Sequence, residues 1–523
     1  MEKTLENIVQ QTFYQPLPKD WLICDDRDLF AQLSEQLYLE LTQFSYYQGR
    51  PLKILLAERD PVRFLAGFLA ACAARCPVFL CNPDWGKQEW QQVFDLVNPD
   101  LIWGLGTRNW GIKTREKGER EGEREREREG EREGEREGER EREREGERER
   151  GRETSLIPSF PHSLIPTFLP PHSAAIMIPT GGSSGKMKFA IHTWETLMAS
   201  VRGFTEHFSL NQVNSFCVLP LYHVSGLMQF MRSFNTGGKL VIQQFKDLES
   251  GQIKNQISTI EPSKFCISLV PTQLQRLLQN PELTEWLSQF QTVLLGGAPA
   301  WNELLEKARY YNIRLAPTYG MTETASQIAT LKPDDFLNGK DSCTQLLPHA
   351  SVKICNEQGE ELNSNQIGNI TIYSQSLALG YYPNTWDNQE YLQVDDLGFL
   401  DKRGYLHIVG RNSEKIITGG ENVYPIEIES TIRATKMVAD VCVIGIPDKL
   451  WGQAVTAIYI PKNSNTSDLE IRNLLKEKLS KFKIPKHWIP VQTLPRNSQG
   501  KINRQQLQTI ATKFIHRTRA KSL

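Results

Sequence analysis

Glycine, hydroxyl and lysine residues gather in one short stretch of the chain, directly after an apolar segment. The stretch reads Pro-Thr-Gly-Gly-Ser-Ser-Gly-Lys-Met-Lys over residues 179–188, and apolar residues 174–178 precede it. Glycines let backbone amides turn toward a polyphosphate, while hydroxyls and lysines add hydrogen bonds and positive charge. A Walker A loop needs Gly where Thr180 stands and Ser or Thr where Met187 stands, so a P-loop NTPase is disfavoured. A phosphate loop and a mobile Gly/Ser turn remain as interpretations.

A second segment combines hydroxyls with a carboxylate and reads Tyr-Gly-Met-Thr-Glu-Thr-Ala-Ser from Tyr319 to Ser326. Thr322 could cap a helix whose positive first turn holds Glu323. Alternatively, Glu323 is a magnesium ligand and Thr322 a phosphate contact, because Mg2+ prefers oxygen ligands. The local sequence leaves both interpretations open.

A third cluster joins carboxylates to an arginine, as Asp395-Asp396-Leu-Gly and then Gly410-Arg411. A carboxylate can accept both hydroxyls of a ribose, and an arginine can strengthen that grip. The competing interpretation is a polar turn between two strands.

Two further motifs and one histidine are less informative alone. Gly419-Gly-Glu-Asn places a glycine pair where the backbone must bend or approach another group closely. Pro495-Arg-Asn-Ser-Gln-Gly-Lys501 would hold a lysine on a loop tip, although a single lysine near a chain end is ordinarily just solvated. His223 could equally be a core histidine.

The elements that must position these motifs follow the order of an α/β protein. Apolar strands at 51–56 and 78–81 flank a helix at 60–74, which is βαβ order. Apolar strands then alternate with helices from 174 to 295, which predicts a large domain with a mostly parallel sheet.

The pattern of predicted strands and helices changes in the last third of the chain. From about Ser351, short strands separated by Gly and Asn turns predict an antiparallel subdomain. The tail shows a smaller α+β pattern. We therefore predict a domain over residues 1–411 and a small C-terminal domain over 412–523.

Composition narrows the class of protein. The 523 residues carry a net charge of −1 and nine cysteines without a C-x-x-C pair, which argues against zinc ribbons and disulfide frameworks. The charge gives no reason to expect nucleic acid or an anionic membrane as partner. The longest apolar stretch, 64–74, is too short to span a bilayer, and the N-terminus shows no secretory signal. We expect a cytoplasmic protein without membrane insertion, and a homo-oligomer stays open.

One run departs sharply from the rest, because residues 115–153 consist of Glu, Arg, Lys and Gly alone. Without apolar side chains, the run cannot offset the entropy of its own ordering, and repeated glycine weakens helix. We expect a disordered insertion and linker over 113–171. An RNA- or protein-binding arm is the alternative, although mixed charge opposes strong phosphate affinity.

The order and spacing of the motifs resemble the adenylate-forming superfamily of acyl-CoA synthetases, peptide-synthetase adenylation domains and luciferases. The resemblance covers the chain apart from residues 115–171, and it implies that the C-terminal domain is a mobile α+β lid that rotates about Ser413. It implies three catalytic residues, Lys501, Thr322 and Glu323, with Glu323 also the metal ligand. It implies ATP and AMP contacts from Thr180, Gly181, Gly182, Ser183, Ser184, Gly185, Lys186, Lys188, Gly296, Gly297, Ala298, Tyr319, Gly320, Asp396 and Arg411.

Within that superfamily, parts of the large domain look like o-succinylbenzoate–CoA ligases, which activate an aromatic dicarboxylate on the route to menaquinone or phylloquinone. The similar stretches are Leu219–Leu227, Arg232, Ser268–Arg276, Leu294–Pro299 and Tyr319–Gln327. The chain departs from the superfamily pattern at Gly181 and Met187, where Ser or Thr and Pro are usual. The charged insertion has no counterpart.

This resemblance implies a two-step ligase that uses ATP, Mg2+ and coenzyme A. Another aryl- or fatty-acyl-CoA ligase, differing only in its pocket, is the alternative. A peptide-synthetase adenylation domain is disfavoured, because no carrier sequence follows Lys501 and no Asp is placed to hold an amino group. The acid pocket would comprise His223, Ser225, Gly226, Leu227, Arg232 and Thr272, and the coenzyme A site Gly419, Gly420 and Glu421.

Overall fold

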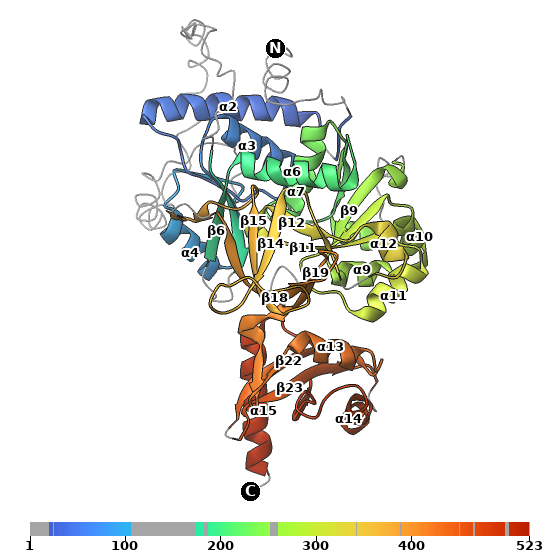
Figure 1. Ribbon diagram of the computed structural model, residues 1–523. Helices are drawn as coiled ribbons and strands as arrows, with labels where there is room; N and C mark the ends of the chain where they lie inside the picture. Colours follow the sequence, from blue (N-terminus) through green and yellow to red (C-terminus); the bar gives the residue numbers. More distant parts are fainter. Residues whose placement is uncertain are drawn as a thin grey trace, which may run out of the picture.

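The computed structural model describes residues 20–24, 26–105, 174–181, 187–250, 260–340, 343–386, 390–448, 450–463, 466–496 and 502–521. The charged insertion and Lys501 therefore lie outside the described residues. Figure 1 shows a larger upper body and a smaller lower body, drawn in orange to red, which meet below β18 (Leu392–Leu400) and β19 (Leu406–Arg411).

The first sheet has seven strands in the order β17-β16-β6-β5-β3-β2-β4. Helix α3 (Pro61–Ala73) joins β2 to β3, which confirms the predicted βαβ unit. Asp60 caps this helix, because its Oδ1 accepts from the Arg63 amide at 2.8 Å. The strands are β2 (Ile54–Leu56), β3 (Val78–Leu80), β4 (Leu101–Trp103), β5 (Ile176–Gly181), β6 (Met187–His192), β16 (Gly380–Tyr381) and β17 (Asn384–Thr385).

The second sheet has eight strands in the order β1-β8-β7-β9-β10-β11-β12-β13. Neighbouring strands run parallel from β1 to β11, and only β12 and β13 are antiparallel, which confirms the mostly parallel prediction. The strands are β1 (Leu22–Ile23), β7 (Asn214–Cys217), β8 (Leu240–Ile242), β9 (Phe265–Leu269), β10 (Thr292–Leu295), β11 (Leu315–Met321), β12 (Ser326–Thr330) and β13 (Gln345–Leu346).

Helices cover both sheets. In Figure 1, α2 (Leu29–Gln48), α3, α6 (Trp194–Phe208) and α7 (Val224–Thr236) lie together across the top of the larger body. Phe68 of α3 meets Phe230 of α7 edge to face, 6.0 Å between ring centres, and both rings are fully buried. The remaining helices of this body are α4 (Lys87–Val97), α8 (Phe245–Glu249), α9 (Pro271–Leu277), α10 (Pro281–Ser288), α11 (Asn302–Tyr310) and α12 (Pro333–Leu337). None of the helices in the described ranges is long and apolar enough to cross a membrane.

The β-rich part and the C-terminal part form separate sheets. Strands β14 (Ala350–Cys355), β15 (Gly368–Ser374), β18 and β19 are all antiparallel, as predicted. After β19, a five-stranded sheet with its own apolar core contains only later residues, and the α+β pattern is confirmed. Its elements are β20 (Ile416–Thr418), β21 (Glu421–Val423), α13 (Pro425–Arg433), β22 (Val438–Asp448), β23 (Gly452–Pro461), α14 (Asp468–Lys476), β24 (His487–Pro490) and α15 (Arg504–Lys521).

Candidate active site

The Tyr319–Ser326 segment forms a tight turn between two antiparallel strands. Strand β11 ends at Met321, a three-residue 3-10 turn holds Thr322 to Thr324, and β12 begins at Ser326. The helix-cap interpretation of Thr322 is therefore wrong. Two remote groups pin the turn: His192 Nε2 lies 2.8 Å from the Thr322 carbonyl oxygen, and the Ala378 amide donates to the Glu323 carbonyl oxygen at 2.8 Å.

The Glu323 side chain joins the turn to the start of the candidate phosphate loop. It is only 8% exposed, and its Oε1 accepts from Thr180 Oγ1 at 3.2 Å and from the Tyr381 hydroxyl at 2.7 Å. Burial, together with the charge of Glu323, raises the pKa of Tyr381, so the phenol stays protonated and donates. Two of the predicted site residues, 143 positions apart in the sequence, thus meet directly.

One carboxylate of this kind fits a magnesium ion that is shared with a nucleotide. Among the described residues, no group of three or more His, Cys, Asp or Glu side chains could hold a metal by itself. Mg2+ ordinarily takes one or two protein carboxylates and fills its other positions with water and substrate phosphates. Glu323 can supply the protein ligand, and the hydroxyls of Thr180 and Tyr381 orient it.

The candidate phosphate loop connects β5 to β6. Thr180 pairs with Lys188 and Gly181 with Met187 across this antiparallel hairpin, while residues 182–186 lie outside the described residues. The Met187 amide donates to Gln92 Oε1 at 2.9 Å, so helix α4 fixes one end of the loop. Neither the β6 strand nor the part played by Gln92 was predicted from the sequence.

Asp396 lies inside strand β18 rather than in a turn, so the polar-turn interpretation is wrong. It is paired across the sheet with Arg411 of β19, whose Nε donates to Asp396 Oδ1 at 3.1 Å. The Tyr319 hydroxyl donates to Oδ2 at 2.8 Å. An ionised carboxylate has about four acceptor positions, so Asp396 can still accept ribose hydroxyls while both contacts persist.

The residues assigned to adenine lie beside Tyr319. Gly296, Gly297 and Ala298 follow β10, which runs parallel to β11, so these residues and Tyr319 share the carboxyl ends of two adjacent strands. Ligands of α/β sheets bind at such ends. A Cβ atom on Gly296 would lie 2.4 Å from Thr318 Oγ1, and one on Gly320 would lie 2.1 Å from the Ser326 carbonyl oxygen. Larger residues are therefore excluded from both positions.

Five of the six residues assigned to the acid pocket lie on α7 or at its N-cap, and the sixth lies on α9. His223 is the N-cap residue, Ser225 to Leu227 form the first turn, and Thr272 lies in the first turn of α9. Gly226 is required there, because a Cβ atom would lie 2.2 Å from the Pro220 carbonyl oxygen. The His223 ring packs against Tyr222 with 4.5 Å between ring centres.

Arg232 of α7 is buried beside neutral groups. It is 3% exposed, and its Nη2 donates to Ser326 Oγ at 3.0 Å and to Gln327 Oε1 at 3.2 Å. Its guanidinium carbon lies 4.1 Å from the centre of the Phe204 ring, and Nε has no hydrogen-bond partner in the described chain. Burial lowers the pKa of Arg232 to about 10. No carboxylate among the described residues lies within ion-pair distance of it, so its positive charge is uncompensated.

His349 is a second buried side chain near Arg232 whose polar atoms lack hydrogen-bond partners among the described residues. Neither of its ring nitrogens has a hydrogen-bond partner in the described chain, and a Cβ atom on Gly203 would lie 1.7 Å from its Nδ1. Burial and the nearby charge of Arg232 lower the pKa of His349 to about 4, so the ring is neutral at pH 7. No motif in the sequence indicated His349.

The candidate hinge and coenzyme A residues lie after β19. Ser413 is in a 3-10 turn (Asn412–Glu414), where its amide donates to Asp395 Oδ1 at 3.1 Å and its hydroxyl also donates to Asp395. Gly419 and Gly420 have φ angles of 61° and 86°, and they turn the chain from β20 into β21, where Glu421 is exposed. The predicted backbone bend is confirmed.

A hairpin of the phosphate-loop type, a buried glutamate and a carboxylate–arginine pair at the ends of neighbouring strands are the features of a nucleotide-binding enzyme. The chain belongs to the AMP-binding enzyme family, which matches residues 48–382, and the AMP-binding enzyme C-terminal domain matches residues 427–501. The resemblance seen in the motifs is thereby confirmed.

Two named relatives and two solved structures show which members of the family the chain resembles. The chain is 35% identical over 348 residues to the 2-succinylbenzoate–CoA ligase of Listeria monocytogenes serovar 1/2a, covering 64% of this chain and 69% of that protein. It is 31% identical over 342 residues to the enzyme of the same name from Enterococcus faecalis, covering 64% and 70%. Its fold matches o-succinylbenzoate CoA synthetase (MenE) from Bacillus subtilis in complex with OSB-AMP, with a TM-score of 0.74, 24% identity and coverage of 96% and 97%. ATP-bound MatB from Rhodopseudomonas palustris matches with a TM-score of 0.71, 20% identity and coverage of 97% and 98%.

Proposed function

We propose that the chain is an AMP-forming ligase that converts o-succinylbenzoate, ATP and coenzyme A into o-succinylbenzoyl-CoA, AMP and pyrophosphate. The observation that carries the proposal is the uncompensated charge of buried Arg232. The names of the relatives support the same substrate.

The substrate has two carboxylates, and they need different surroundings. One reacts with the nucleotide, and the other must leave water with a cation or hydrogen-bond donors to receive it. Arg232 donates to Ser326 and Gln327, the first two residues of β12, which follows the Glu323 turn. The guanidinium group therefore lies close to the turn that would hold the reacting groups, but it is not part of that turn. Folding has already removed water from this arginine. The free energy of binding a second carboxylate therefore does not include the cost of desolvating the guanidinium group.

In the first half-reaction, an oxygen of the other carboxylate attacks the α-phosphorus of ATP, and the bond from that phosphorus to the bridging oxygen of pyrophosphate breaks. This step needs charge neutralisation more than proton transfer. Glu323 would hold Mg2+, which neutralises phosphate charge when bound. Thr180, Lys188 and the loop between them would hold the phosphates, Asp396 and Arg411 the ribose, and Lys501 the reacting phosphate.

In the second half-reaction, the coenzyme A sulfur loses its proton and attacks the acyl carbonyl carbon, and the bond from that carbon to the AMP oxygen breaks. We propose that residues 412–523 rotate about Ser413 between the two steps. Lys501 would then leave, and the Gly419–Glu421 turn would arrive beside the pantetheine. The exposed hairpin at Gly419 and Gly420 supports this assignment, because its backbone is available for a close approach. Rotation also keeps water from the reactive anhydride.

Coenzyme A-dependent release of AMP tests the proposal directly. The purified chain would be given ATP, Mg2+ and coenzyme A with o-succinylbenzoate, benzoate or palmitate. We expect rapid AMP release with o-succinylbenzoate and little with the other two. Faster turnover of benzoate or palmitate would favour the alternative, another aryl- or fatty-acyl-CoA ligase.

All nine cysteines are free and buried, which supports the cytoplasmic location that the sequence predicts.

A further inference from the structure

Arg232 and His349 come from different elements and meet the same two parts of the fold. The first part is the start of β12, where Arg232 donates to Ser326 Oγ and Gln327 Oε1. The loop that carries His349 is tied to the next position of the same strand, because an amide two residues before His349 donates to the Ile328 carbonyl oxygen at 2.8 Å. His349 itself directly precedes β14.

The second part is one turn of helix α6. The guanidinium carbon of Arg232 lies 4.1 Å from the centre of the Phe204 ring. The His349 imidazole occupies the space beside the adjacent residue, Gly203, where a Cβ atom would overlap Nδ1. The guanidinium and the imidazole therefore pack against neighbouring residues of the same helix. Their proximity contributes to the low pKa of His349, which burial and then the charge of Arg232 lower to about 4.

Both side chains bury polar atoms that the folded chain leaves without partners. Nε of Arg232 and both ring nitrogens of His349 have no hydrogen-bond partner among the described residues. A neutral imidazole carries a proton on one nitrogen, so an N–H donor is buried here without an acceptor, which is costly. Nδ1 is the ring atom nearest to Gly203 and faces α6, so Nε2 is the nitrogen left to meet a ligand.

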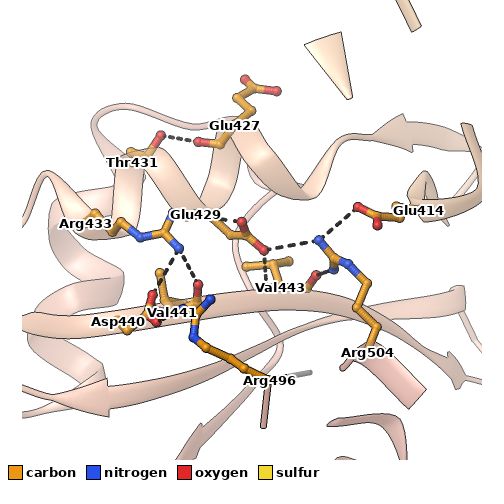
Figure 2. Close-up of polar contacts among 10 residues, drawn as sticks. All are labelled: Glu414, Glu427, Glu429, Thr431, Arg433, Asp440, Val441, Val443, Arg496 and Arg504. Atoms are coloured by element: carbon orange, nitrogen blue, oxygen red, sulfur yellow. Dashed lines mark hydrogen bonds and ion pairs between the residues drawn. The ribbon is translucent and has the colours of Figure 1, made fainter. Parts of the chain in front are cut away.

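Arginines of the C-terminal part show how the chain itself ordinarily supplies a counter-charge. Figure 2 shows Arg433 and Arg496, whose Nη2 atoms donate to the two oxygens of Asp440 at 3.2 Å and 2.5 Å. Within the described ranges, Arg232 has no carboxylate of this kind, and the imidazole of His349 beside it is neutral. An anion that reached Arg232 from outside the chain would therefore find a second hydrogen-bond donor next to the cation.

We propose that His349 is a further specificity-determining residue, whose Nε2–H donates to the same substrate carboxylate that Arg232 receives. The inference rests on the proposed function, in which the second carboxylate of the acid reaches Arg232. A carboxylate has about four acceptor positions, so it accepts from both groups at once. A carboxamide of the same size would turn its own N–H donors toward these donors, and the pair of residues therefore selects the ionised acid.

Two variants remove the His349 donor by different routes. His349→Phe keeps an aromatic ring but has no nitrogen. Gly203→Ala leaves the imidazole intact and places a Cβ atom where Nδ1 now lies, so the ring must move. We expect both variants to lower kcat/KM for o-succinylbenzoate roughly tenfold to a hundredfold, the range for a hydrogen bond to a charged group. The KM for ATP should stay within about twofold of wild type.

A rescue variant and a matched substrate separate recognition from packing. His349→Gln should restore most of kcat/KM, because its amide can donate from about the position of Nε2. The analogue of o-succinylbenzoate with a carboxamide in place of the second carboxylate should change less than about threefold in every variant. His207→Phe is the control, because His207 is buried one turn further along α6 and its Nε2 also lacks a partner in the described chain. It should leave the preference for the dicarboxylate unchanged.

The outcomes distinguish this inference from the proposed function. If the wild type activates the carboxamide as fast as o-succinylbenzoate, no second carboxylate is recognised, and both are wrong. If Arg232→Met abolishes the preference while His349→Phe and Gly203→Ala preserve it, the proposed function stands and the role of His349 is overturned. An equal loss with both acids would mean that the imidazole fills space or binds water, which also overturns that role. Melting temperatures identify a variant that has lost its fold, and if Gly203→Ala is one, the comparison of His349→Phe with His349→Gln decides.

Discussion

Replacing Arg232 by methionine should separate substrate recognition from folding. Methionine keeps most of the length and apolar bulk of the side chain and removes the charge. Within the described part of the chain, the partners of this charge are Ser326, Gln327 and the Phe204 ring. The variant should therefore lose the cation that we assign to the second carboxylate while keeping the packing of α7 against its neighbours.

The expected size of each effect follows from these contacts. Burial lowers the pKa of Arg232 from 12.5 to about 10. At about 1.4 kcal/mol for each pKa unit, the charged form is penalised by roughly 3 kcal/mol. Hydrogen bonds from a charged donor return about 1.5–3 kcal/mol each, so the opposing contributions nearly cancel. We expect the free energy of unfolding to change by less than about 2 kcal/mol.

Substrate activation should change far more. Removing one partner of a desolvated charge pair costs about 2–5 kcal/mol. With about 1.4 kcal/mol for each tenfold change, kcat/KM for o-succinylbenzoate should fall roughly 30-fold to 3,000-fold. The KM for ATP should barely move. An aryl acid without a second carboxylate should be activated as well as before, or better, because its ring would no longer face an unpaired cation.

The assay is AMP release with each acid, together with urea unfolding. Arg202→Met is the control, because Arg202 is an exposed charge on α6 that also influences His349. If Arg232→Met lowers kcat/KM equally for both acids, or for neither, then Arg232 does not receive the second carboxylate. A fall in stability of more than about 4 kcal/mol would instead mean that Arg232 is a structural residue, since removing a buried paired charge has that cost.

Four further predictions follow from the same structure. Lys501→Ala should abolish most acyl-adenylate formation but spare thioester formation from supplied acyl-adenylate, whereas Gly420→Leu should do the reverse, because a side chain would intrude where backbone approaches pantetheine; single-turnover assays of each half-reaction check both. Deleting residues 115–153 should leave activity and melting temperature nearly unchanged, because the run has no apolar side chains to bury; a large fall in either would show that it is part of the fold. Tyr381→Phe should raise the Mg2+ concentration for half-maximal adenylation about tenfold, since it removes a hydrogen bond that orients Glu323; an unchanged Mg2+ titration would contradict the assignment. Burial lowers the pKa of His192 from 6.5 to about 4, so only the unfolded chain takes up that proton between these values; the free energy of unfolding should fall by up to about 3 kcal/mol as pH drops through this window, and urea titrations of His192→Gln should show a shallower fall.

The sequence predicted β2, β3, β5, β7, β8, β9 and β10 with helices α3, α6 and α9, because their apolar residues are continuous or regularly spaced, but it did not place β1, β4, β11, β12 or helix α2. It missed β6, which follows directly on a polar loop and so lacks a boundary signal. The Thr322 turn shows a different limit. A threonine followed by a glutamate suits a helix N-terminus, yet here β12 pairs back on β11, and the Thr324 hydroxyl accepts from the Met321 amide at 3.0 Å. Pairing between strands overrode a local preference.

Asp396 shows why the site was harder to predict than the fold. Two aspartates before Leu-Gly are typical of a turn, but the carboxylate of Asp396 is satisfied inside a strand by Tyr319, which is 77 positions away. Tyr381 and Gln92 also reach their partners across long separations, and neither belongs to a recognisable motif. Composition and spacing report on neighbours along the chain, whereas these contacts depend on how distant strands are brought together.

Arg411, Arg504 and Arg232 show what the structure adds about charge. Arg411 is paired with Asp396, and Arg504 with Glu414 and Glu429, so their counter-charges come from the chain itself. Arg232 is the most deeply buried of the three, and its neighbours in the described chain are neutral. Folded proteins have only about 5–15 kcal/mol of net stability, and burying the charge of Arg232 costs roughly 3 kcal/mol before its two hydrogen bonds offset that cost. A fold that tolerates such a charge is best explained if the missing anion arrives with the substrate. We therefore expect Arg232, rather than the paired arginines, to decide which acid enters the site.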